Sequence, residues 1–258
     1  MLQTYRLMYS VKVMAETYEA NRPITKYVHS TSRGHEAIQL ATAFQLKPQD
    51  WVSPYYRDES LLLGMGWTPY ELMLQLLTKA DDPFTGGRSY YSHPNSRAED
   101  KPKIIHQSSA TGMQVIPTTG VAQGIQYLET INDQQATNSH EKPIVICSLG
   151  DASVTEGEVS EALQFAVLKN LPIIYLVQDN EWGISVTSAE GRAMDAYEYA
   201  EGFKGLNKIR VDGTDFAASY DIMRKVVNHV REHRKPWLVH AKCTLLNHHT
   251  SGVRKEFY

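Results

Sequence analysis

The chain has few cysteines, no long apolar run and little net charge. Only two of its 258 residues are cysteine, Cys147 and Cys243. Both fall in predicted strands, which favours buried thiols in a reducing compartment, the cytoplasm, over a disulfide framework. No stretch of about 18 apolar residues occurs, so no membrane-spanning helix is predicted. The formal net charge is −3 and no basic run is present, which argues against nucleic-acid binding.

Apolar and charged residues are present in the proportions of an ordinary globular protein. Hydrophobic residues make up 42% and charged residues 21% of the chain. This composition and length suit one large α/β domain with a substantial core, and we expect residues 1–258 to form a single domain. Residues 81–103 are rich in Pro, Gly, Tyr and Ser, and we expect them to form a long loop over the functional site.

A strand–helix–strand unit is the clearest local pattern. Residues 143–149 and 172–177 are apolar, β-branched runs typical of buried strands. Between them, apolar residues recur at helical spacing, and Thr155 with Glu158 predicts a capping box at the start of that helix. Two strands joined by a helix in this way are parallel neighbours.

Further elements extend this unit into a larger sheet. Strands are predicted at residues 208–211 and 237–243, with a helix from 216 to 234 between them, and an amphipathic helix is predicted from 2 to 20. The fold class is therefore α/β, with a parallel sheet flanked by helices.

Polar residues directly follow both strands of the central unit. Asp151 comes after the first strand and Asn180 after the second. Ligands of such sheets bind beyond the carboxyl ends of the strands, so these two side chains should face one crevice. A carboxylate, an amide oxygen and a main-chain carbonyl suit Mg²⁺, while the N–H groups of Ala152 and Ser153 can hold phosphate oxygens.

Gly150-Asp151-Ala152, followed a helix and a strand later by Asp179-Asn180, resembles the thiamine diphosphate motif, commonly written Gly-Asp-Gly and Asn-Asn. The sequence departs from that motif twice. Ala152 adds a methyl group where a phosphate comes close, and Asp179 replaces the first Asn. The resemblance implies thiamine diphosphate bound through Mg²⁺. On spacing alone, an ordinary α/β turn with a capping Asp remains the alternative.

From about Gly34 to Thr250, the chain resembles one branch of that superfamily, the E1 α subunits of 2-oxo acid dehydrogenases of the branched-chain (2-oxoisovalerate) or pyruvate type. The resemblance rests on an ordered series of motifs: Gly34-His35-Glu36-Ala37, Tyr56-Arg57-Asp58, Gly86-Gly87-Arg88 with His93, Ser108-Ser109-Ala110-Thr111-Gly112, Glu181-Trp182-Gly183-Ile184-Ser185 and Asn247-His248-His249-Thr250-Ser251.

The resemblance implies roles for particular residues. Arg57, in its motif with Tyr56, contacts the diphosphate, although taken alone Arg57 is also typical of a surface salt bridge with Asp58 or Glu59. The segment with Ser109 and Thr111 passes under the thiazolium ring, although Ser109 also suits a helix N-cap.

The metal ligands implied are Asp151, Asn180 and the main-chain carbonyl of Trp182. His249 is placed at the active-site channel as the catalytic candidate. His93 is left out, because a lone loop histidine is more often a hydrogen-bonding residue. The resemblance also places Thr250 at a phosphorylation position of animal members.

The activity implied is the oxidative decarboxylation of a 2-oxo acid, with transfer of the acyl group to a lipoyl-bearing E2 acyltransferase. The resemblance favours branched-chain substrates, on Ser108-Ser109 and residues 247–250, over pyruvate. The glutamate that activates the cofactor comes from a β subunit in this family, which implies an E1 β partner and an α₂β₂ assembly. The chain ends soon after His249, so we expect either a truncated chain or the front part of an α–β fusion.

Other functions remain open at the level of sequence. An acetoin dehydrogenase α chain shares almost every motif, and a transketolase-like enzyme shares the Gly-Asp motif. A noncatalytic structural homologue is supported by Ala152, by Asp179 and by the short C-terminal region. A dinucleotide-binding domain is weaker, because no Gly-x-Gly-x-x-Gly follows a strand.

Overall fold

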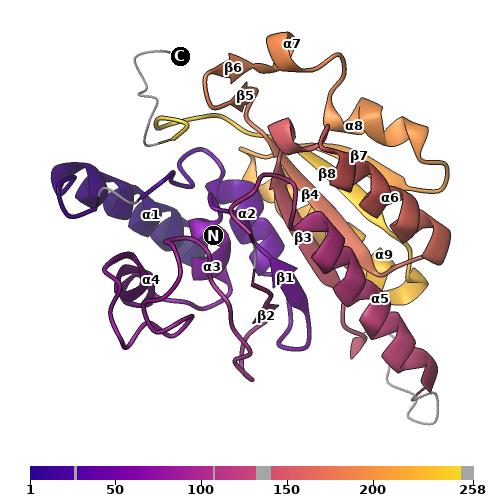
Figure 1. Ribbon diagram of the computed structural model, residues 1–258, viewed down its shortest axis with the longest axis horizontal. Helices are drawn as coiled ribbons and strands as arrows, with labels where there is room; N and C mark the ends of the chain where they lie inside the picture. Colours follow the sequence, from indigo (N-terminus) through magenta and orange to yellow (C-terminus); the bar gives the residue numbers. More distant parts are fainter. Residues whose placement is uncertain (26–27, 107, 132–140, 251–258) are drawn as a thin grey trace.

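A six-stranded parallel sheet forms the centre of the computed structural model, which describes residues 1–25, 28–106, 108–131 and 141–250 (Figure 1). The strand order is β2-β1-β3-β4-β8-β7, and each pairing in this sheet is parallel. The strands are β1 Trp51–Ser53, β2 Lys103–Ile104, β3 Val145–Gly150, β4 Ile173–Asp179, β7 Asn207–Asp212 and β8 Trp237–Lys242. The predicted α/β class with a parallel sheet is confirmed.

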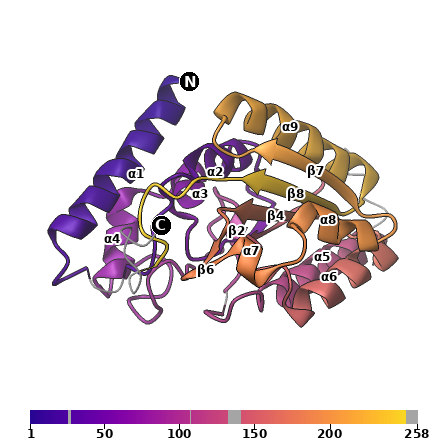
Figure 2. The ribbon, with the colours of Figure 1, turned by 90° about the horizontal axis from the view of Figure 1, so that it is seen from above.

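Helices cover both faces of the sheet. They are α1 Leu2–Ala20, α2 Glu36–Ala43, α3 Glu59–Gly64, α4 Pro69–Leu76, α5 Val115–Ile131, α6 Gly157–Lys169, α7 Ser188–Gly191, α8 Ala196–Tyr199 and α9 Phe216–His233. Seen from above, α9 and α2 lie on one side of the strands and α5 and α6 on the other, while α1 stands beside α2 and α3 (Figure 2). The described residues also form the 3₁₀ turns Asp151–Ser153 and Ala200–Gly202 and a hairpin of β5 Trp182–Gly183 and β6 Val186–Thr187.

Alternation along the central strands divides the core into two layers. Ile144 and Ile146 pack in the cluster that contains α2 and α9 residues, whereas Val145, Cys147 and Leu149 pack against α5 and α6. Successive side chains of a strand point to opposite faces, so a strand covered on both sides reads as a continuous apolar run. This is why the sequence identified β3 and β4 correctly.

The start of α6 differs from the prediction. The helix begins at Gly157 with Glu156 as its N-cap, and no side chain caps it, so the capping box expected from Thr155 and Glu158 is wrong. The chain first makes the 3₁₀ turn after β3, which delays the helix. Asn170 ends α6 in the left-handed conformation, φ 52°, as an amide side chain tolerates.

A buried ion pair closes the amino-terminal edge of the sheet. Asp50, directly before β1, pairs with Arg231 of α9, and both side chains are at most 2% exposed. Asp50 also accepts the N–H of Ile144 at 3.0 Å, which ties the same edge to β3. Among the residues that the structure describes, no helix is long and apolar enough to cross a membrane.

Candidate active site

A cavity of about 230 Å³ opens beyond the carboxyl ends of β1, β3, β4 and β8. Segments far apart in the sequence meet there because parallel strands present their carboxyl ends at one edge. Every residue predicted to bind cofactor or metal lines it: Tyr56, Arg57, Ser109, Thr111, Asp151, Ala152, Ser153, Asn180, Trp182 and His249. The structure thus brings the predicted set together, while the role of each residue stays a prediction.

Arg57 contributes a positive charge to the wall of this cavity. Its side chain is buried, and its guanidinium donates to the main-chain carbonyls of Thr31 at 3.3 Å and His249 at 3.0 Å. The surface salt bridge with Asp58 or Glu59 is therefore not the role of this residue. Its Nε is buried with no hydrogen-bond partner among the described residues. A buried, unpaired donor at a cavity wall suits an anionic ligand such as phosphate.

The loop that carries His249 is held by a close backbone crossing. Gly34 has a φ of 95°, and a Cβ at this position would lie 1.5 Å from the carbonyl oxygen of Thr244. Only glycine permits that approach. The N–H of Leu246 donates to the carbonyl of Arg33 at 3.2 Å. The Gly-His-Glu-Ala motif therefore positions the late His-His segment, a contact that spacing along the sequence does not reveal.

Asp151, Asn180 and Trp182 form one continuous polar rim. The N–H of Asn180 donates to Oδ1 of Asp151 at 3.4 Å, and the N–H of Trp182 donates to Oδ1 of Asn180 at 3.1 Å. Glu181 between them has a φ of 67°, which turns the chain sharply. Carboxylate, amide and carbonyl oxygens are the donors that Mg²⁺ prefers, so the chemistry of this set fits the metal.

The described residues contain no cluster of three or more His, Cys, Asp or Glu side chains arranged to hold a metal. A Mg²⁺ ion at this rim would rely on one carboxylate together with neutral oxygens and the ligand's phosphates.

A buried histidine orients the amide of Asn180. The Nε2 of His35 lies 3.2 Å from Nδ2 of Asn180, and its Nδ1 lies 2.9 Å from Oε1 of Gln178. Burial, followed by the charge of Arg57, lowers the pKa of His35 to about 3. The neutral ring accepts from the Asn180 amide and donates to Gln178. This leaves Oδ1 of Asn180 directed toward the rim.

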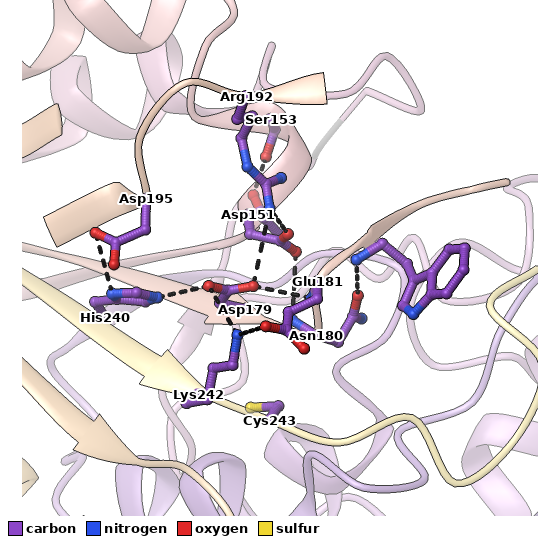
Figure 3. Close-up of polar contacts among 12 residues, drawn as sticks. Asp151, Ser153, Asp179, Asn180, Glu181, Arg192, Asp195, His240, Lys242 and Cys243 are labelled. Atoms are coloured by element: carbon purple, nitrogen blue, oxygen red, sulfur yellow. Dashed lines mark hydrogen bonds and ion pairs between the residues drawn. The ribbon is translucent and has the colours of Figure 1, made fainter. Parts of the chain in front are cut away.

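Behind the rim lies a network of charged side chains (Figure 3). Arg192 forms ion pairs with Asp151, by a short contact, and with Asp179, at 3.9 Å. On its far side, Asp179 accepts a hydrogen bond from Nε2 of His240 at 2.8 Å and lies 3.7 Å from Nζ of Lys242. The two carboxylates thus share one guanidinium.

The two carboxyl groups respond to this environment in opposite directions. Burial and the negative charge of Asp179 raise the pKa of Asp151, against the lowering effect of Arg192. Burial also acts to raise the pKa of Asp179, but the hydrogen bonds from His240 and the N–H of Glu181, with the charge of Lys242, hold it below its ordinary value. Asp179 is therefore the firmly ionised member of the pair.

The methyl group of Ala152 packs beside Gly183, where no side chain is present. A Cβ built on Gly183 would lie 3.0 Å from the Cβ of Ala152, so the absence of a side chain at Gly183 makes room for it. The two positions form a complementary pair across the 3₁₀ turn and the β5–β6 hairpin. The sequence departure at Ala152 is thus accommodated in the packing of the protein itself.

His93, which the sequence analysis left aside, lines the cavity. Its Nε2 lies 3.0 Å from Oγ of Ser109 and its Nδ1 lies 2.9 Å from the carbonyl of Tyr91. Ser109 is not the N-cap of α5, because that helix begins at Val115. The expected loop over residues 81–103 is present as the segment that delivers His93, and Thr111 lines the same wall of the cavity.

Two other residues at the site escaped the sequence analysis. Arg192 and His240 belong to no motif, and only the fold places them behind Asp151 and Asp179. Ile184 adopts a φ of 61°, a strained value for a β-branched residue, at the turn of the β5–β6 hairpin. Ser251, the last residue of the late motif, lies outside the described residues.

Comparisons with known proteins agree with this arrangement. The profile of the family described as Dehydrogenase E1 component matches residues 5–258. The chain is 28% identical to 2-oxoisovalerate dehydrogenase subunit alpha 1 of Arabidopsis thaliana, over 97% of this chain and 50% of that protein. It is 29% identical to 2-oxoisovalerate dehydrogenase subunit alpha of Bacillus subtilis, over 85% of this chain and 62% of the relative.

The chain is also similar to a pyruvate dehydrogenase subunit in sequence and to a transketolase in fold. The pyruvate dehydrogenase E1 component subunit alpha of Rickettsia prowazekii is 30% identical over 81% of this chain and 60% of its own length. The transketolase of Campylobacter jejuni shares the fold, with a TM-score of 0.56 and 19% identity over 79% of this chain and 32% of that chain. The chain thus spans about half to three-fifths of the length of these curated relatives.

Proposed function

Because this chain belongs to the Dehydrogenase E1 component family, we propose that it is the α subunit, or α part, of a 2-oxo acid dehydrogenase E1 enzyme that binds thiamine diphosphate and Mg²⁺. The observation that carries the proposal is the convergence of Arg57, Asp151, Asn180 and His249 on one cavity, with an unpaired buried donor on Arg57. The guanidinium of Arg57 suits the phosphate oxygens of a diphosphate, and the oxygens of Asp151 and Asn180 suit the Mg²⁺ bound to it.

When bound, thiamine diphosphate supplies the carbanion and the electron sink for decarboxylation, and the protein's share is binding and orientation. Arg57, with Tyr56 beside it, holds the diphosphate, helped by the main-chain N–H groups of Ala152 and Ser153. Asp151, Asn180 and the carbonyl of Trp182 hold the metal.

The remaining residues act at the other wall of the cavity. Ser109 and Thr111 support the ring of the cofactor. Burial and the charge of Arg57 lower the pKa of His249 to about 3, so its imidazole is neutral near pH 7 and would act at this wall through hydrogen bonds and not by taking up a proton.

The substrate is proposed to be a branched-chain 2-oxo acid. The relatives named for 2-oxoisovalerate include proteins of plant and bacterial origin, and pyruvate is the second candidate. The acyl group would pass to a lipoyl-bearing E2 acyltransferase. These steps belong to the complete enzyme, of which the chain spans a part.

A second chain, an E1 β subunit, is proposed to complete the site in an α₂β₂ assembly. The exposed face of α5, which follows the cavity-lining residues Gly112 and Gln114, supports this partner. Ile116, Tyr127 and Ile131 are exposed there, and a Cβ on Gly120 or Gly124 would meet nothing within 4 Å. Two glycines inside a helix cost about 1 kcal/mol each relative to alanine, a cost that close approach of a partner backbone can offset.

This partner surface can be tested with one substitution. Gly124→Gln should leave the chain folded but block association with the β chain, because the new side chain would occupy the contact. Gly157→Gln in α6 is the matched control, since its position is equally open. Native mass spectrometry of the mixed chains reads the result, and assembly of the Gly124→Gln variant at the normal level would contradict the proposed interface.

The function itself is tested by calorimetric titration of thiamine diphosphate with Mg²⁺ into the chain, alone and with a β chain. Binding that depends on Mg²⁺, tightens with the β chain and is lost in Asp151→Ala supports an E1 α subunit. Absence of binding in the assembled state would indicate a noncatalytic homologue. Turnover of acetoin in place of 2-oxo acids would instead identify an acetoin dehydrogenase α chain.

A further inference from the structure

Arg192 holds the carboxylate that the proposed metal requires. Its guanidinium contacts Oδ2 of Asp151 and lies 3.9 Å from Oδ1 of Asp179. The side chains of all three residues are at most 7% exposed. Two carboxylates buried side by side need a counter-charge, because an uncompensated buried charge is strongly destabilising. In the protein without metal, Arg192 provides that charge.

The same contact conflicts with metal binding. A divalent cation at Asp151 would place its charge next to the guanidinium that already neutralises this carboxylate. The second oxygen of Asp151 is oriented by the N–H of Asn180 at 3.4 Å. Either cation stabilises the ionised Asp151, and the two repel each other at close range.

Arg192 has room to move away from Asp151. It reaches Asp151 from the side of a second cavity, of about 460 Å³, which Arg192 lines. The wall of that cavity carries the acidic side chains Asp179, Asp195 and Glu198 together with the cations Arg210 and Lys242. The catalytic cavity lies on the other side of Asp151. A guanidinium leaving Asp151 would therefore keep carboxylate partners in the second cavity.

We propose that Arg192 is a displaceable counter-cation, which neutralises Asp151 in the metal-free protein and is driven into the second cavity when Mg²⁺ binds. The inference rests on the proposed function, since it takes Asp151 as a metal ligand. Arg192 is a positioning residue, because it keeps Asp151 ionised and in place without contacting the cofactor. The affinity for Mg²⁺ then includes the cost of moving one arginine.

The test is Mg²⁺ titration by calorimetry into the full chain saturated with thiamine diphosphate, for the natural protein, Arg192→Gln and Arg224→Gln. Arg224 is the control, because it pairs with Asp221 on the exposed side of α9 and lines neither cavity. Removal of the competitor should tighten Mg²⁺ binding at least about fivefold in Arg192→Gln, the lower end of ordinary coupling between two ligands. Arg224→Gln should leave the affinity unchanged.

A second measurement, on the natural protein, tests the inference even if Arg192→Gln does not fold. In the natural protein, the side-chain Nε–Hε NMR signal of Arg192, assigned by its loss in Arg192→Lys, should move when Mg²⁺ is added. An unmoved signal, or an Mg²⁺ affinity in Arg192→Gln that is equal to or weaker than that of the natural protein, overturns the inference.

The two proposals fail separately. Mg²⁺ binding in the natural protein that is lost in Asp151→Ala, without a gain in Arg192→Gln, overturns the role of Arg192 and leaves the proposed function standing. No Mg²⁺ binding in either the natural protein or Arg192→Gln, even with a β chain present, overturns the proposed function itself.

Discussion

The guanidinium of Arg57 donates to the main-chain carbonyl of His249 across 192 residues of sequence, at 3.0 Å. The residue proposed to bind the diphosphate therefore also fixes the loop that carries the catalytic candidate. Binding of an anion at Nε of Arg57 would leave these contacts in place, because they use the terminal nitrogens. The fork of an arginine can do both at once, and a lysine cannot.

We expect Arg57→Lys to weaken thiamine diphosphate binding by roughly 10- to 100-fold, the effect of losing one hydrogen bond to a charged group. Calorimetry in the presence of Mg²⁺ measures it. Arg88→Lys serves as the control, because Arg88 is exposed in the loop of residues 81–103. Equal affinity of Arg57→Lys and the natural protein would show that the fork is not used for the cofactor.

The pairing of Ala152 with Gly183 predicts a rescue experiment. Gly183→Ala should destabilise the protein by about 1–3 kcal/mol, since two Cβ atoms cannot approach to 3.0 Å without a shift. Adding Ala152→Gly should recover much of that loss. Urea unfolding measures both variants. Gly191→Ala is the control, because a Cβ there would meet Val186 at an ordinary 3.5 Å. Additive losses in the double variant would refute the pairing.

The Asp50–Arg231 pair should matter for stability and not for binding. Asp50→Asn leaves the guanidinium of Arg231 without its buried carboxylate, which should cost about 3–5 kcal/mol of unfolding free energy. The exposed pair of Asp221 and Arg224 is the comparison, and Asp221→Asn should cost less than about 1 kcal/mol. Denaturant unfolding gives both numbers. A loss of similar size in the two variants would contradict the assigned difference.

Asp58 should give the protein a distinctive pH dependence. Burial raises the pKa of Asp58 to about 6 in the folded state, against hydrogen bonds from Ser148, Gln178 and the N–H of Tyr55. Between the unfolded pKa of 3.8 and about 6, the folded state binds more protons than the unfolded state. This carboxyl group therefore adds stability as pH falls through that window, and the contribution is lost as pH rises above it.

The measurement is unfolding free energy of the natural protein and Asp58→Asn at pH 7 and pH 5. The natural protein should gain about 1 kcal/mol relative to the variant between these two pH values. A constant difference would mean that Asp58 does not titrate in this range.

The sequence predicted the sheet best where the chain is buried on both faces. β3 and β4 are continuous apolar runs, and β7, β8, α1 and α9 appear at the expected places. The short strands β1 and β2 were missed. They have three and two residues, respectively, which is too few to show the alternation of apolar and polar residues typical of a strand. The capping box at Thr155 failed because the chain makes the 3₁₀ turn Asp151–Ser153 first and α6 begins only at Gly157, with Glu156 as its N-cap.

The site was predictable to the extent that it depends on strand ends and motifs. Asp151 and Asn180 follow their strands, so their meeting was expected from the parallel sheet alone. Arg57, Thr111 and His249 were found through the family resemblance. Arg192 and His240 were not found, because their contacts depend on how the segment after the β5–β6 hairpin folds back, and no local pattern encodes it.

The buried pair of Asp50 and Arg231 stands at the amino-terminal edge of the sheet, and the proposed site stands at the carboxyl-terminal edge. The ion pair that stabilises the sheet and the cavity proposed to bind ligand therefore lie at opposite ends of the same strands. Loops at the carboxyl-terminal edge can therefore change in sequence while the Asp50–Arg231 pair at the other end holds the sheet together. Divergence within such a lineage should therefore concentrate at one edge, and engineering of specificity can begin there without first reinforcing the scaffold.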